Sequence, residues 1–146
     1  MSRDAFIGVL ACARAADGAY PEAERTLVNL ICQNHVLTRG LEPQSYQRIV
    51  QDVKRRSEEV GWTAAIKEYL SALPPDWAYT TLLSVIDICL IDANEDQSER
   101  RCIDVVAGHF AVPGEHVESF MHWFRVKNGL LLEDPTLAQQ DRVQVA

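Results

Sequence analysis

Two groups of oxygen-bearing side chains, 75 residues apart, are the parts of this sequence best suited to chemistry. The first group contains Asp17, Glu22 and Glu24, and the second contains Asp92, Asn94, Asp96 and Glu99. Carboxylate and amide oxygens are the ligands that hard divalent cations such as Ca²⁺, Mg²⁺ and Mn²⁺ prefer. The sequence therefore predicts a divalent cation at one or both groups. Because the glycines are isolated and form no phosphate-cradling loop, we expect no organic cofactor.

The second group begins like the calcium-binding loop of an EF-hand, with Asp92, Asn94 and Asp96 at alternate positions. The match then ends, because that loop requires a glycine at Gln97 and a bidentate glutamate at Ile103. The segment is therefore not an EF-hand, although Glu99 could close a shorter loop. This group offers more ligands than the first, so if only one group binds a cation, we expect it to be this one.

Both groups also have a purely structural interpretation. An aspartate at the end of a helix can cap loop amides, and a glutamate early in a helix is favoured by the positive end of the helix dipole. If the two groups lay side by side, four or more carboxylates would repel one another unless a cation or protons neutralised them. Capping and cation binding both remain open from the sequence.

The two groups belong to a gapless internal repeat that also preserves the hydrophobic pattern. The matched pairs include Asp17 with Asp92, Glu24 with Glu99, Arg25 with Arg100, Val28 with Ile103 and Ile31 with Val106. A repeat that preserves both carboxylates and apolar positions indicates two copies of one helix–turn–helix unit. We place the repeat halves at about 3–37 and 78–112, with each acidic group at the corner between two helices.

Apolar residues recur at helical spacing along most of the chain, and no strand-like alternation is present. Helices are expected over about 3–16, from Pro21 to near His35, from Pro43 to before Gly61, from Thr63 as N-cap to before Pro74, over about 76–91 and 97–110, and after Pro113. The predicted fold is all-α, a compact bundle of about seven helices with two pseudo-symmetric halves. It forms one domain over residues 1–128, and 129–146 are predicted to be a polar, partly disordered tail.

The first corner reads Ala15-Ala16-Asp17-Gly18 followed by Glu22-Ala23-Glu24-Arg25, and a degenerate copy follows a central apolar helix. With this motif, the chain resembles the TerB-like tellurite-resistance family over about residues 3–127. The resemblance implies a small all-helical domain with two related halves. It also implies a divalent-cation role for Asp17, Glu24, Asp92 and Glu99. The chain departs from the family at Ala93, where glycine is common, and Asn94 and Asp96 offer extra oxygens beside it.

The resemblance further implies a non-enzymatic sensor or adaptor in a bacterial stress or tellurite-resistance system, acting through protein partners that the sequence does not identify. The alternative is a purely structural protein-interaction module whose acidic turns only cap helices. A metal-dependent hydrolase would need an ordered base beside the metal, and the sequence shows none.

Composition narrows the possible partners. The net charge of −7 argues against a nucleic-acid-binding surface, and the basic run 54–56 is followed at once by Glu58 and Glu59. No apolar run is long enough to span a bilayer, so we expect no membrane insertion. The N-terminus enters an amphipathic helix without the features of a signal peptide, which predicts a cytoplasmic protein.

The remaining features of the sequence that could carry chemistry are the cysteines, the histidines, Asp87 and the aromatic residues around Trp123. The cysteines, at positions 12, 32, 89 and 102, are expected to be buried thiols, and the histidines match no zinc motif. Asp87 is the one carboxylate in an apolar helix: it could face outward, join the acidic centre or pair with Arg14, and we favour the pair. Trp123, together with Phe120 and Phe124, could form an exposed partner surface.

Overall fold

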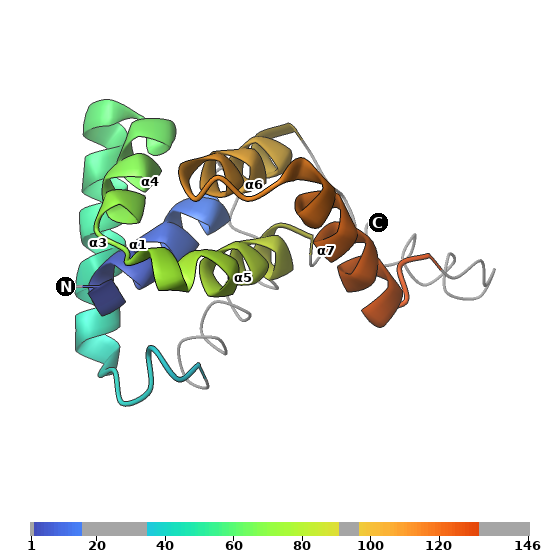
Figure 1. Cartoon of the computed structure of the whole chain (residues 1–146). Coiled ribbons are helices and arrows are strands. Elements are labelled where there is room, and N and C mark those ends of the chain that lie inside the picture. The colour runs from blue at the N-terminus through green and yellow to red at the C-terminus, as the bar shows by residue number, and fades with distance from the viewer. Residues whose placement is uncertain (1, 16–34, 91–96, 132–146) are drawn as a thin grey trace, which may run out of the picture.

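The computed structural model describes residues 2–15, 35–90 and 97–131, and most of these residues are helical (Figure 1). The α-helices are α1 (Ser2–Ala15), α3 (Pro43–Val60), α4 (Trp62–Ser71), α5 (Ala78–Leu90), α6 (Gln97–His109) and α7 (Gly114–Lys127), and a 3₁₀ helix, η1 (Pro75–Trp77), precedes α5. The described part of the chain contains no strand, which confirms the all-α prediction there. The predicted helix ending near His35 and most of the predicted tail lie outside the described residues. The count of seven helices therefore stays a prediction.

Proline and glycine set most of the helix ends that the sequence predicts. Pro43 is the first residue of α3, and Gly61 ends that helix with a backbone φ of +83°. Because an L-residue with a side chain rarely adopts this φ, glycine is suited to the position. The prediction of Thr63 as N-cap is wrong, because α4 begins one residue earlier, at Trp62. Gly61 is both the C-cap of α3 and the N-cap of α4, and no side chain caps the start of α4.

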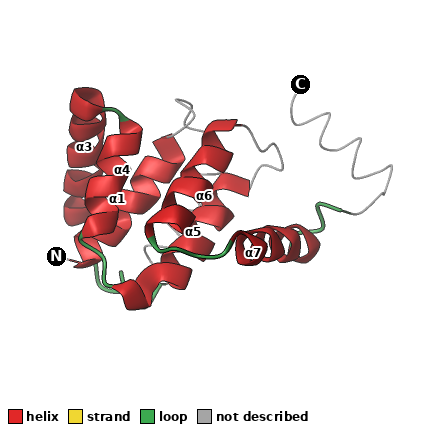
Figure 2. Ribbon diagram, turned by 45° about the horizontal axis from the view of Figure 1, so that its top comes forward, coloured by secondary structure: helices red, strands yellow, loops and turns green. Residues whose placement is uncertain are grey.

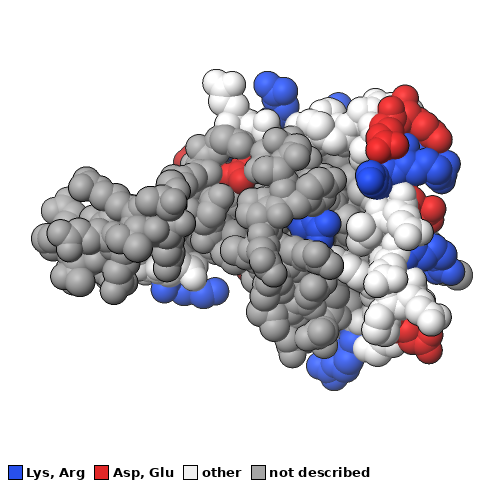
Figure 3. Space-filling model, turned by 180° about the vertical axis from the view of Figure 1, so that it is seen from behind, with Lys and Arg blue, Asp and Glu red and all other residues white. Residues whose placement is uncertain are grey.

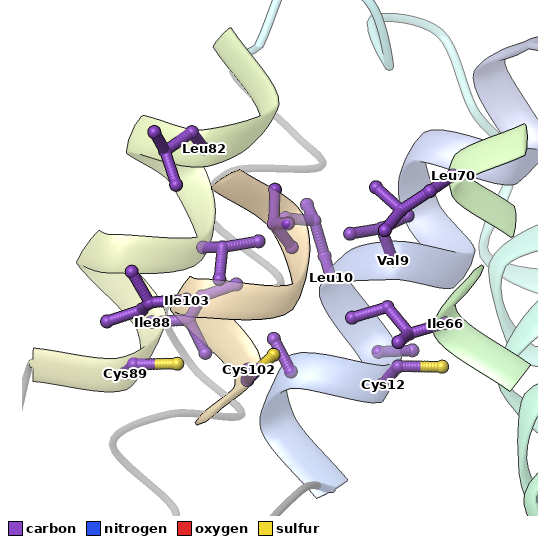
Figure 4. Close-up of a cluster of buried hydrophobic side chains, with 14 of the residues drawn as sticks. Val9, Leu10, Cys12, Ile66, Leu70, Leu82, Ile88, Cys89, Cys102 and Ile103 are labelled. Atoms are coloured by element: carbon purple, nitrogen blue, oxygen red, sulfur yellow. The ribbon is translucent and has the colours of Figure 1, made fainter. Parts of the chain in front are cut away.

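The core is built around α1 and α5. α1 packs against α3, α4 and α5, while α5 also contacts α6 and α7. Figure 4 shows side chains from α1, α4, α5 and α6 meeting in one apolar layer, with Leu10 and Ile103 among them. The predicted central position of the most apolar helix is therefore confirmed, since nine residues of the 13-residue α5 are buried.

The two central helices occupy corresponding places in the internal repeat. An offset of 75 residues moves Ser2–Ala15 onto positions 77–90, and α5 spans Ala78–Leu90. The two helices also pack against each other. The partner helix of the first copy lies outside the described residues, so the pseudo-symmetry of the complete halves stays a prediction.

One close approach fixes the spacing of α1 and α4. A Cβ atom built on Gly8 would lie 2.6 Å from a ring carbon of Tyr69, which is shorter than a carbon–carbon contact allows. The absence of a side chain at Gly8 therefore lets the aromatic ring lie directly against the backbone of α1.

The far side of α3 carries charges of both signs, which Figure 3 shows intermingled at one corner of the molecule. The Arg56 guanidinium donates to both oxygens of Glu68, over 2.9 and 2.7 Å, and to Glu59 over 3.0 Å. These bonds join α3 to α4. The basic run 54–56 therefore lies within a charge-balanced surface, in agreement with its predicted role as a solvated helix face.

Candidate functional site

Glu99 is the one candidate metal ligand that lies within the described residues. The other six, Asp17, Glu22, Glu24, Asp92, Asn94 and Asp96, lie outside them. The predicted convergence of Asp17, Glu24, Asp92 and Glu99 therefore stays a prediction.

Glu99 is the third residue of α6, and only 2% of its surface is exposed. Glutamate is a residue type that is rarely fully buried, because moving its charge out of water is costly unless a partner compensates. Its neighbours one turn further along α6, Cys102 and Ile103, are buried in the apolar core. A buried carboxylate at this position therefore requires compensating partners.

The third position of a helix gives a glutamate two ways to be stabilised. Its carboxylate can accept a hydrogen bond from the N-cap backbone amide in a capping box, and it also benefits from the helix dipole. It can equally contribute an oxygen to a cation held by residues of the preceding turn. The burial of Glu99 is compatible with both arrangements.

Within residues 2–15, 35–90 and 97–131, no three His, Cys, Asp or Glu side chains are grouped closely enough to hold a metal ion. The three described histidines of the α6–α7 region contact aromatic rings instead. His109 lies against Phe110, His116 against Tyr79, and His122 against Trp123.

The favoured pairing of Asp87 with Arg14 is wrong. Asp87 is half-buried on α5, and the charge that acts on its pKa is that of Lys127, at the end of α7, not that of Arg14. Burial raises the pKa of Asp87, and the positive charge of Lys127 acts in the opposite direction. Sequence reasoning missed this neighbour because Lys127 is 40 positions away and reaches Asp87 only through the packing of α7 on α5.

A second feature that the sequence did not indicate is the connection between α6 and α7 through Arg100. Its guanidinium donates to Asp104 on its own helix, over 3.2 Å, and to Glu118 on α7. The same side chain contacts the Met121 sulfur at 3.4 Å. Arg100 follows Glu99 directly, so the start of α6 carries both the buried carboxylate and the link to α7.

Tyr79, His116 and Phe120 form an aromatic cluster between α5 and α7. The Tyr79 hydroxyl lies 3.2 Å from Nδ1 of His116, and its ring meets that of Phe120 edge-on at 5.8 Å. Trp123 is 62% exposed, whereas Phe120 and Phe124 are half-buried against the core. The predicted surface around Trp123 is thus exposed mainly at the tryptophan itself.

The cysteines at positions 12, 89 and 102 are buried and form no disulfide, as predicted, while Cys32 lies outside the described residues. Figure 4 shows the three in the apolar layer on α1, α5 and α6. Burial raises the pKa of the Cys12 thiol to about 12; the proximity of Cys102 adds to this, and the Ser57 hydroxyl opposes it. Such a thiol stays protonated and is a poor nucleophile at neutral pH.

Comparison with known proteins identifies no relative of this chain. No family model matches the chain, and neither a curated protein nor a solved structure matches it. None of the described helices combines the length and apolar character needed to cross a lipid bilayer.

Proposed function

We propose that this chain is a non-enzymatic helical adaptor domain, TerB-like in character, that binds a divalent cation at its acidic corners. The cation would be Ca²⁺, Mg²⁺ or Mn²⁺, with the corner that leads into α6 as the principal site. The observation that carries the proposal is the burial of Glu99 directly after the acidic segment 92–96. A cation there would neutralise both Glu99 and the aspartates that precede it.

The proposal assigns the ligands by position in the two corners. Asp92, Asn94, Asp96 and Glu99 would supply oxygens at the second corner, and the first corner would supply the remaining acidic residues, Asp17, Glu22 and Glu24. The internal repeat supports an equivalent use of both corners. A role in a bacterial stress or tellurite-resistance system, in the cytoplasm and through a protein partner, follows from the family resemblance alone.

A thermal-shift series with the three cations tests the proposal. A ligand that binds only the folded state stabilises it by about 2.7 kcal/mol at one hundred times Kd. For a chain of this length, that corresponds to a rise in Tm of roughly 5–10 °C. We expect such a rise with at least one cation and a return to the starting Tm after chelation.

Glu99→Gln separates cation binding from capping. Glutamine also serves at the third position of a capping box, so this variant keeps the cap while removing one charged ligand. We expect Glu99→Gln to keep its Tm without cation and to lose most of the cation-induced rise. Glu58→Gln, the same change at an exposed position on α3, is the matched control and should respond like the wild type.

The second candidate function is a purely structural interaction module, and the position of Glu99 in the first turn of α6 favours it as well. Under this alternative, no cation raises the Tm of the wild type. Glu99→Ala would then cost about 1 kcal/mol, while Glu99→Gln would cost little.

A further inference from the structure

α7 is the helix with the least support from the rest of the described structure. Figure 2 shows it at one end of the molecule, away from α3 and α4. It packs mainly on α5, and only Val117 and Met121 of its 14 residues are buried. Arg100 adds the polar link to α6 through Glu118. The outward face of α7 is therefore available to a partner.

This outward face carries large apolar side chains. With about 3.6 residues per turn, Ser119, Trp123 and Val126 lie on the same side of the helix. Trp123 is 62% exposed and Val126 is 44% exposed. Tyr79 and Leu83, one turn apart on α5, are also exposed, and Tyr79 contacts α7 through Phe120. We call these four exposed side chains, Tyr79, Leu83, Trp123 and Val126, the α5–α7 surface. Exposed large apolar side chains on two helices that pack together are typical of a protein-interaction site.

The charges on α7 indicate what kind of partner fits this surface. Glu115 is exposed in the first turn, and Lys127, whose charge also acts on Asp87 of α5, is exposed in the last turn. Met121 lies midway between them in sequence, and the apolar side chains of the outward face lie within the same stretch. A helix with an acidic start, an apolar middle and a basic end is complementary in charge to an antiparallel copy of itself.

We propose that a second copy of this chain binds the α5–α7 surface, with the two α7 helices antiparallel about a twofold axis near Met121. Trp123 of each copy then covers apolar surface of the other near the axis. The acidic end of each α7 lies near the basic end of its partner. This self-association is separate from cation binding, since it uses no residue of the acidic corners.

The size of the α5–α7 surface determines the affinity expected for the dimer. A 14-residue helix is about 21 Å long, so the pair of α7 helices and the adjoining α5 residues form an interface at the small end of the usual range. Small interfaces of this kind belong to weak, reversible dimers. We expect a Kd in the micromolar range, on the order of 10–100 µM.

Sedimentation equilibrium on the full chain tests the proposal. The protein concentration is varied between about 5 and 500 µM, a range that spans the expected Kd. Over this range, the weight-average mass should rise from 16.4 kDa towards twice that value. The same rise is expected with a chelator present, which keeps this test independent of the proposed cation site. A mass that stays at 16.4 kDa throughout would overturn the proposal.

Val126→Ala and Val60→Ala form a matched pair of variants, because both valines are exposed at comparable fractions, 44% and 38%, on different helices. We expect Val126→Ala to weaken the dimer several-fold and Trp123→Ala to weaken it at least tenfold, while Val60→Ala leaves it unchanged. Exposed side chains contribute little to folding, so the Tm of each dilute variant should stay near that of the wild type. A dimer that survives Trp123→Ala would exclude this surface.

Glu115→Lys tests the antiparallel arrangement. The new lysine would lie near Lys127 of the other copy, so we expect a several-fold loss of affinity that shrinks in high salt. Glu58→Lys on α3 makes the same charge change away from the surface and should have no such effect. Equal effects of the two variants, or none, would contradict the antiparallel pairing.

Discussion

Burial of the Cys12 thiol makes the stability of the fold depend on pH in the alkaline range. In the folded chain, the pKa of this thiol is about 12, against 9.0 for the same group in water. Because the folded pKa is raised, the contribution to stability is complete below pH 9 and is lost as the pH rises towards 12. The free energy of unfolding should therefore fall by about 1.4 kcal/mol per pH unit above pH 9 on account of this one group.

Cys12→Ala isolates that contribution. Urea unfolding at several pH values between 8 and about 10.5 should give parallel curves below pH 9 and, above pH 9, a shallower fall for the variant than for the wild type, by about 1.4 kcal/mol per pH unit. Ionisable groups without a charge interaction with Cys12 affect both proteins alike and cancel in the difference; Tyr69 is the exception, because Cys12 contributes to the rise of its pKa. Curves for the two proteins that stay parallel above pH 9 would show that the thiol is not buried as described.

The surroundings of some single residues could be predicted from the sequence, and those of others could not. The burial of the cysteines followed from their apolar neighbours in helical stretches. The surroundings of Asp87 did not follow, because they depend on how α7 packs against α5 and not on helical spacing. Glu99 was predicted as a ligand, but its nearly complete burial is a property of the α6 start packing into the core.

The contact between α1 and α4 gives a test at the scale of helices. Gly8→Ala would place a Cβ atom 2.6 Å from the Tyr69 ring, so the ring or the helix must move. Overpacking of this kind costs about 1–3 kcal/mol, which the better helix propensity of alanine offsets by about 0.5–1 kcal/mol. We expect Gly8→Ala to lower the free energy of unfolding measured by urea denaturation.

Gly108→Ala is the matched control for that variant. Gly108 also lies in a helix, α6, but a Cβ atom there would meet nothing within 4 Å. The substitution should therefore raise stability by about 0.5–1 kcal/mol through helix propensity alone. If both alanine variants were stabilising, the close approach of α1 and α4 would be refuted.

The helices themselves were largely predictable, because each carries an apolar stripe and many end at proline or glycine. The predicted segments over about 3–16 and 97–110 agree within one residue at each end with α1 and α6. The start of α4 was misplaced, since Gly61 begins the helix by its backbone conformation while Thr63 offered a more familiar side-chain cap. The contacts between helices could not be predicted, because they arise from side chains distant in sequence.

For the molecule as a whole, the acidic corner and the α5–α7 surface are joined by α6. Glu99, at the start of α6, belongs to the proposed cation site, and the adjacent Arg100 holds α7 through Glu118. The proposed adaptor thus has its ligand site and its partner surface on neighbouring elements. The sequence predicted the first of these from a repeated pattern of oxygens. It indicated the second through Trp123 together with Phe120 and Phe124, and of these three the tryptophan is the exposed one.

Direct calorimetric titration of the chelator-treated full chain with Ca²⁺, Mg²⁺ and Mn²⁺ is the sharpest test of the proposed cation site. We expect saturable binding of at least one cation, with a Kd between about 10⁻⁷ and 10⁻³ M as in protein calcium sites. We also expect Asp92→Asn combined with Glu99→Gln to weaken binding at least tenfold. No binding of any of the three cations by the wild type, or unchanged affinity in the double variant, would contradict the proposed cation site.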